Sequence, residues 1–129
     1  MQKQFIIIGS LLGALAVILG AFGAHSLKSV IPEHIDTFHT GVQYHFYHTI
    51  AIFVVVSLFG KLPEKALKIA GRMFIMGIIC FSGSLYLLAC KDLLGINTSI
   101  LGPITPIGGT FFIIGWSILL WNAFKMEKN

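Results

Sequence analysis

Hydrophobic and polar positions alternate along this chain in blocks much longer than those of a water-soluble domain. Four apolar stretches cover residues 5–24, 42–60, 70–90 and 104–124. A helix needs about 20 mostly apolar residues to cross the hydrocarbon core of a bilayer. The pattern therefore predicts an all-α fold, a four-helix transmembrane bundle that makes up residues 1–129 as a single integral membrane domain.

The composition also indicates that lipid is the solvent. Of 129 residues, 56% are hydrophobic and 11% are charged, whereas about 25% of an ordinary soluble domain is charged. The first stretch exceeds the usual apolar region of a signal peptide, so we expect a span there. The net charge of +4 does not indicate a nucleic-acid partner, because the cations flank the apolar stretches instead of lining one face.

The basic residues predict how the bundle is oriented. With four spans, both termini and the loop between the second and third spans lie on one side. Seven of the nine Lys and Arg residues fall there: Lys3, Lys61, Lys65, Lys68, Arg72, Lys125 and Lys128. Lys28 and Lys91 fall on the other side. Because cytoplasmic loops are rich in Lys and Arg, we expect cytoplasmic termini in a multi-pass protein of the cell membrane.

Small residues recur at helical spacing within the predicted spans. The first span has a stripe that includes Gly9, Gly13 and Gly20, and the fourth has Gly108 and Gly109 near its start. Helices in lipid associate by close van der Waals packing, which small residues permit. The stripes either pack the helices of one chain together or join copies in a homo-oligomer.

The polar chemistry is concentrated at the predicted outer side. All five histidines lie in one short window: His25, His34, His39, His45 and His48. At about 100° per residue, His45 and His48 share one side of the second helix, and Tyr44 flanks His48. His25 ends the first span at the same membrane face. We therefore expect His25, His45 and His48 to converge, with Tyr44 beside them, as candidate ligand-binding residues.

Three interpretations of this cluster stay open. Neutral histidines would brace the bundle by hydrogen bonds, or they would hold a metal ion, a haem or a small ligand, or they would belong to a transporter or channel path. Imidazole is the commonest metal ligand, but the helical zinc pattern with a glutamate between two histidines is absent. The metal and cofactor are therefore left unassigned.

Catalysis is not predicted. No acidic residue lies in the middle of a span, and no serine has an evident base at its depth. The expected function is a non-enzymatic structural or interaction component of the membrane, with ligand binding at the histidines as the alternative and transport as the second.

Prolines suggest where helices begin. Pro32 suits the first turn of an extension of the second helix back toward Glu33. Pro103 and Pro106 indicate either a simple helix start or an unwound segment that lines a pocket. Trp116, deeper in the fourth span, is expected to pack against a small-residue face.

Three motifs in this chain resemble those of a known family. They are GAFGAH at residues 20–25, QYHFYH at 43–48 and PITPIGG at 103–109. Together they are similar to domain-of-unknown-function family 423, which includes animal transmembrane protein 256. The resemblance implies a small multi-pass membrane protein, at the cell membrane in bacteria, and no established activity or cofactor. His34 and His39 lie outside the motifs and rank below the other three histidines.

Overall fold

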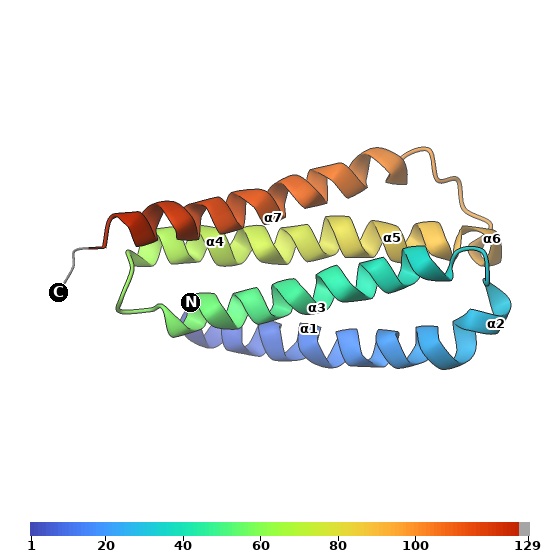
Figure 1. Cartoon of the computed structure of the whole chain (residues 1–129), viewed down its shortest axis with the longest axis horizontal. Coiled ribbons are helices and arrows are strands. Elements are labelled where there is room, and N and C mark those ends of the chain that lie inside the picture. The colour runs from blue at the N-terminus through green and yellow to red at the C-terminus, as the bar shows by residue number, and fades with distance from the viewer. Residues whose placement is uncertain (127–129) are drawn as a thin grey trace.

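The chain folds into an elongated bundle of helices, shown in Figure 1 as a computed structural model that describes residues 1–126. No strand occurs in that range. The helical elements are α1 Gln2–Phe22, η1 Gly23–Leu27, α2 Lys28–Val30, α3 Ile35–Ser57, α4 Glu64–Gly77, η2 Ile78–Ser82, α5 Gly83–Ala89, α6 Lys91–Leu94 and α7 Leu101–Phe124. The all-α prediction is therefore confirmed. Lys128, one of the residues used to predict orientation, lies outside the described residues.

Three helical segments are long and apolar enough to cross a membrane. They are Gln2–Val30, Glu64–Ala89 and Leu101–Phe124. The 23-residue α3 is not among them, because its histidine, glutamine and threonine side chains lower its mean hydropathy. By length and composition, three of the four predicted spans are confirmed, and the second stays a prediction.

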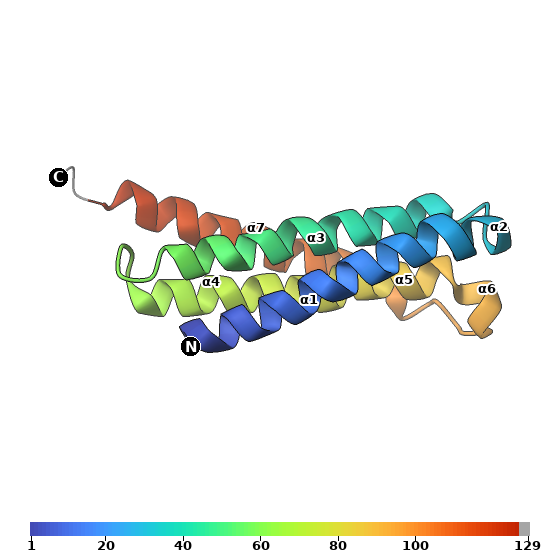
Figure 2. The ribbon, with the colours of Figure 1, turned by 90° about the horizontal axis from the view of Figure 1, so that it is seen from below.

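The helices lie side by side and alternate in direction along the long axis. Figures 1 and 2 show α1 beside α3 and α7 beside the segment formed by α4, η2 and α5. The α3 helix contacts both pairs, so it joins the two halves of the bundle. The start of α1, the end of α7 and the connection between α3 and α4 lie at one end.

The core consists of large apolar side chains where these helices meet. Phe5, Ile52, Leu67 and Phe74 are almost fully buried in the main cluster. A second cluster closes the end near α2 and α6, and its buried members are Leu27, Ile31, Phe38 and Ala89. The buried side of α3 is thereby placed at the centre of the molecule.

The turn before α3 corrects the predicted position of Pro32. The helix begins at Ile35, and Pro32 lies in a turn that the His34 backbone N–H closes by donating to the Ile31 carbonyl at 3.0 Å. Proline suits the second position of such a turn because its φ is fixed. The expectation that Pro32 occupies the first turn of the helix was therefore wrong.

The start of α7 is a regular helix. It runs from Leu101 through Pro103 and Pro106 without interruption. Pro103 lies in the first turn, where a backbone N–H would have no helical partner. Of the two interpretations of this segment, the simple helix start is the one that the structure has.

Glycines bring neighbouring helices of the same chain together. On α1, a Cβ added at Gly9 would lie 3.0 Å from the Phe53 ring of α3, and one at Gly20 would lie 3.4 Å from Val42. Gly13 faces Thr49 of α3 in the same way. The stripe of α1 therefore packs onto α3 within one chain, and a homo-oligomer through the glycine stripes stays a prediction.

Candidate functional site

The buried face of α3 carries two of the candidate histidines. His45 and His48 expose 1% and 6% of their surface, and Gly41 and Ile52 lie buried on the same face. Thr49 is buried as well, and its hydroxyl donates to the His45 carbonyl at 2.8 Å. Polar groups in membrane helices usually face the protein interior, and this side of α3 fits that rule.

Both ring nitrogens of His48 are hydrogen-bonded, one to α7 and the other to its own helix α3. The indole N–H of Trp116 lies 3.1 Å from His48 Nε2. The other nitrogen, Nδ1, lies 2.8 Å from the Tyr44 backbone carbonyl. An indole N–H only donates and a carbonyl only accepts. These partners therefore assign His48 as neutral, with its proton on Nδ1 and its Nε2 lone pair accepting from Trp116.

Aromatic rings surround the His48 imidazole. Phe112 of α7 stacks on it with a centroid distance of 3.5 Å and an interplanar angle of 8°. Phe74 of α4 approaches at 5.7 Å, and Tyr44 lies nearly parallel at 6.1 Å. The packing fixes the orientation of the ring from three helices. The neutral imidazole thus serves as a polar centre inside an aromatic cluster.

His45 makes a second link between helices. Its Nδ1 lies 2.8 Å from the Tyr86 hydroxyl of α5. Its Nε2 is buried and has no hydrogen-bond partner among the described residues. The Leu12 carbonyl of α1 faces the ring without reaching hydrogen-bond geometry. His45 is therefore half satisfied, unlike His48.

The structure does not bring His25 to this cluster. His25 lies on η1 and is exposed. The helix continues past it to Val30, so this residue does not end the first helix as the sequence suggested. His39 is exposed on the outer side of α3. Among the described residues, no three His, Cys, Asp or Glu side chains are grouped closely enough to hold a metal ion.

Tyr44 lies at the edge of the cluster. It is 39% exposed, and its ring packs at 4.7 Å from Phe81 and at 6.0 Å from Tyr47. Only its backbone carbonyl touches His48 by a hydrogen bond. Tyr44 therefore orients His48 through its main chain and presents its side chain to the surface.

Sequence reasoning missed the two side chains that hold the histidines. Trp116 was expected to pack against small residues, and it instead donates to His48, with its ring at 5.1 Å from Phe74. Tyr86 was not linked to His45. The available signal was the polar edge of each aromatic ring, because a buried indole N–H or phenol O–H usually finds a partner.

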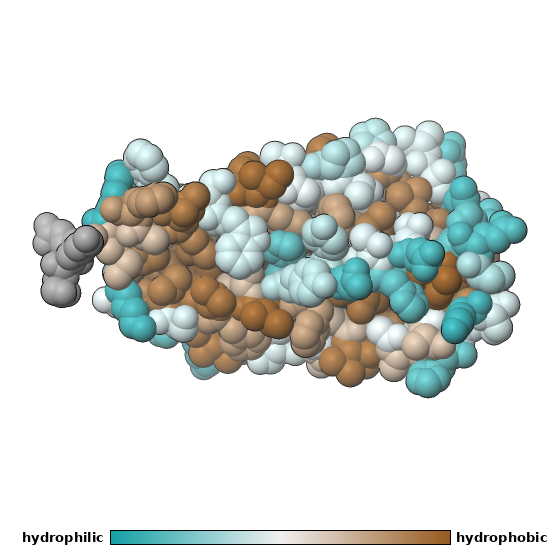
Figure 3. Space-filling model, in the orientation of Figure 1, coloured by the Kyte–Doolittle hydropathy of each residue, from teal (hydrophilic) through white to brown (hydrophobic). Residues whose placement is uncertain are grey.

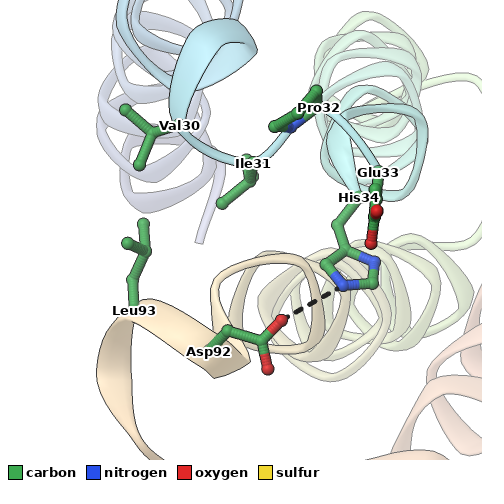
Figure 4. A pocket seen from close by; sticks show the side chains of 7 residues that line it. All are labelled: Val30, Ile31, Pro32, Glu33, His34, Asp92 and Leu93. Atoms are coloured by element: carbon green, nitrogen blue, oxygen red, sulfur yellow. Dashed lines mark ion pairs between the residues drawn. The ribbon is translucent and has the colours of Figure 1, made fainter.

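A second group of polar side chains lies at the end of the bundle formed by α2 and α6. His34 Nε2 and Asp92 Oδ2 are 3.3 Å apart, and they join the turn before α3 to α6 (Figure 4). They border a cavity of about 260 Å³, whose lining residues are Val30, Ile31, Pro32, Glu33, His34, Asp92 and Leu93. The cavity is open and its walls are partly apolar. It is therefore a gap between the turn before α3 and α6, and it does not enclose a ligand.

Long apolar helices, small residues at the helix contacts and a polar cluster that the protein interior covers together define a helical integral membrane protein. The chain belongs to the family described as proteins of unknown function, DUF423, whose model matches residues 19–109. His45 and His48 both lie within the matched range.

Curated relatives extend the likeness over nearly the whole chain. This chain is 47% identical over 126 residues to the UPF0382 membrane protein YwdK of Bacillus subtilis. The aligned region covers 96% of this chain and 98% of that protein. A UPF0382 membrane protein of Haemophilus influenzae is 36% identical, with 99% of each chain covered. One from Staphylococcus aureus is 40% identical over 96% of this chain and 98% of its own length. No solved structure matches.

Proposed function

We propose that this chain is a non-enzymatic structural or interaction component of the cell membrane, in which neutral buried histidines brace four spanning helices. This proposal rests on the two hydrogen bonds of the His48 ring. One comes from Trp116 of α7, and the other goes to the Tyr44 carbonyl of α3. Both of its nitrogens are occupied by protein groups, so no lone pair is left for a metal ion. This favours bracing over ligation at His48.

The four-span arrangement rests on α3 crossing the membrane with the other segments. Its 23 residues extend about 35 Å, which matches a hydrocarbon core of about 30 Å. Its most polar interior groups, His45, His48 and Thr49, are covered by neighbouring helices. Mean hydropathy counts these residues as if lipid surrounded them and so underestimates α3 as a span.

The proposed orientation places the termini in the cytoplasm. The start of α1, the end of α7 and the α3–α4 connection share one end of the bundle, and most of the basic residues lie there. The positive-inside rule then assigns that end to the cytoplasm. The cavity near His34 and Asp92 faces outward in this arrangement.

The absence of carboxylates from the interior supports a non-enzymatic role. The buried polar side chains in the described part of the chain are histidine, threonine and serine. General acid–base catalysis would need a positioned group that is free to exchange a proton with a substrate. The neutral His48, held on both sides, does not offer one.

A second candidate function is the binding of a small hydrogen-bonding ligand at His45. It is favoured by the buried Nε2 of His45, which has no hydrogen-bond partner among the described residues. Unpartnered buried polar atoms in native proteins call for an explanation, and a bound molecule is one of them.

The deciding experiment compares His45→Gln and His48→Gln with His25→Gln, a matched control at an exposed histidine of η1. Bracing predicts a lower melting temperature for the first two variants in detergent, with the control unchanged. Elemental analysis and an absorption spectrum of the native protein complete the test. Near-stoichiometric metal or a haem band that a folded His48→Gln variant lacks would overturn the bracing proposal.

A further inference from the structure

The α3 helix has a second polar face, which points away from the buried histidines. His39, Gln43 and Tyr47 follow one another at four-residue spacing and are all exposed. Figure 3 shows hydrophilic residues crossing the apolar surface over α3. Four residues are about one helical turn, so these side chains form a continuous stripe along the helix.

Two residues of this stripe, Gln43 and Tyr47, fall within the predicted second span of residues 42–60, where lipid is a poor solvent for polar side chains. If α3 spans the membrane as proposed above, Gln43 and Tyr47 lie about 12 Å and 18 Å from the start of α3, at 1.5 Å per residue. Within the described part of the chain, neither side chain makes a hydrogen bond. Hydrocarbon offers no donor or acceptor, so polar groups at this depth are stabilised by another protein surface.

The surroundings of the stripe have the composition of an interface. Tyr44 and Tyr47 pack edge to face at 6.0 Å, and Trp116 of α7 exposes 46% of its surface. Trp116 reaches α3 through its hydrogen bond to His48, so its exposed ring adjoins this helix. Tyrosine and tryptophan are enriched where proteins associate, and charged side chains are depleted there.

The chemistry of the stripe selects a second copy of this chain as the partner. Two copies inserted in the same direction are related by a twofold axis along the membrane normal. Each residue of one α3 therefore lies at the same depth as its counterpart in the other copy. A glutamine amide, a tyrosine hydroxyl and a neutral imidazole each contain both a donor and an acceptor. Every residue of the stripe can therefore bond to its own counterpart.

We propose that His39, Gln43 and Tyr47 of α3, flanked by Tyr44 and Trp116, form the interface of a parallel homodimer in the membrane. This surface differs from the glycine stripes, because Gly9 and Gly20 are already packed against α3 in the same chain. The homodimer would place the two copies of Gln43 against each other near the axis. Beside it, a cavity of about 110 Å³ between α1 and α3 leaves room for a side chain of the second copy.

Disulfide cross-linking in native membranes tests the interface. The two free cysteines, Cys80 and Cys90, are first replaced by alanine. Gln43→Cys and Tyr47→Cys are then oxidised with copper phenanthroline, beside Val17→Cys on α1 and Ile113→Cys on α7 as exposed apolar controls. We expect a band of twice the monomer mass for positions 43 and 47 and none for the controls. An equal yield at all four positions, no dimer, or an adduct of another mass overturns the proposal.

A second readout separates failure of the dimer from failure of the proposed span. A water-soluble maleimide should not label Gln43→Cys if α3 lies in the membrane. Protection without a cross-link would reject the homodimer and leave the span intact, whereas rapid labelling would reject both. In liposomes, Gln43→Leu should weaken dimerisation about three- to tenfold by energy transfer between labelled copies, and an unchanged affinity would count against the interface.

Discussion

Trp116 of α7 donates its indole N–H to Nε2 of His48 on α3 across 3.1 Å. The two residues are 68 positions apart in the sequence, and their bond joins the two helices. The same His48 bonds its own helix through the Tyr44 carbonyl. A neutral histidine thus converts a contact between α3 and α7 into a directional one.

Trp116→Phe should destabilise the protein by about 1 kcal/mol, because it keeps an aromatic ring but leaves the buried Nε2 of His48 without a donor. The measurement is thermal or denaturant unfolding in detergent, followed by circular dichroism. Trp121→Phe is the control, since Trp121 is 62% exposed near the end of α7 and contacts Lys125. Equal stability of the two variants would show that the hydrogen bond contributes nothing measurable.

Gly108→Ala and Gly109→Ala should differ sharply although the two positions are adjacent. A Cβ at Gly108 would overlap the backbone nitrogen of Phe81, and a backbone cannot rotate away as a side chain does. A Cβ at Gly109 would only touch the Phe81 ring at 3.8 Å. We expect a loss of about 1–3 kcal/mol or more for Gly108→Ala. Gly109→Ala should be neutral or up to about 1 kcal/mol stabilising, from helix propensity.

Unfolding of both glycine variants under the same conditions checks this contrast. Folded, native-like Gly108→Ala with unchanged stability would mean that α7 and η2 do not approach as closely as the structure has them. The comparison needs no ligand and no activity, so it tests the packing alone.

Asp92→Asn should have a small effect that is confined to one end of the bundle. The His34–Asp92 pair is largely exposed, with 73% of the Asp92 side chain accessible, and such pairs contribute about 1 kcal/mol at most. Hydrogen exchange should rise in the turn before α3 and in α6, with little change elsewhere. Glu33 lines the same cavity and makes no ion pair within residues 1–126, so Glu33→Gln serves as the control. Faster exchange throughout the bundle would assign the pair a larger role.

The sequence predicted the long helices and the grouping of His45 with His48, because both follow from composition and helical periodicity. It did not predict the partners Trp116 and Tyr86, since those contacts depend on which helices become neighbours. His25 was misplaced because the sequence analysis ended the first span at this residue, whereas the helical segment continues through η1 to Val30 and leaves His25 exposed. Mean hydropathy did not select α3 as a span, since it counts His45 and His48 as fully polar although other helices cover both side chains.

The proposed orientation of the bundle predicts which residues can be labelled from outside the cell. In a Cys80→Ala/Cys90→Ala background, a membrane-impermeant maleimide added to intact cells should label Lys28→Cys and leave Lys65→Cys unlabelled. Both lysines are exposed, so access alone does not favour either position. Cys80 and Cys90 must be removed because both are free, and label on either would be counted as labelling of the introduced cysteine. Permeabilised cells should label both variants, which confirms that each is present and reactive. Labelling of position 65 alone in intact cells would reverse the topology and place the cavity beside His34 and Asp92 in the cytoplasm.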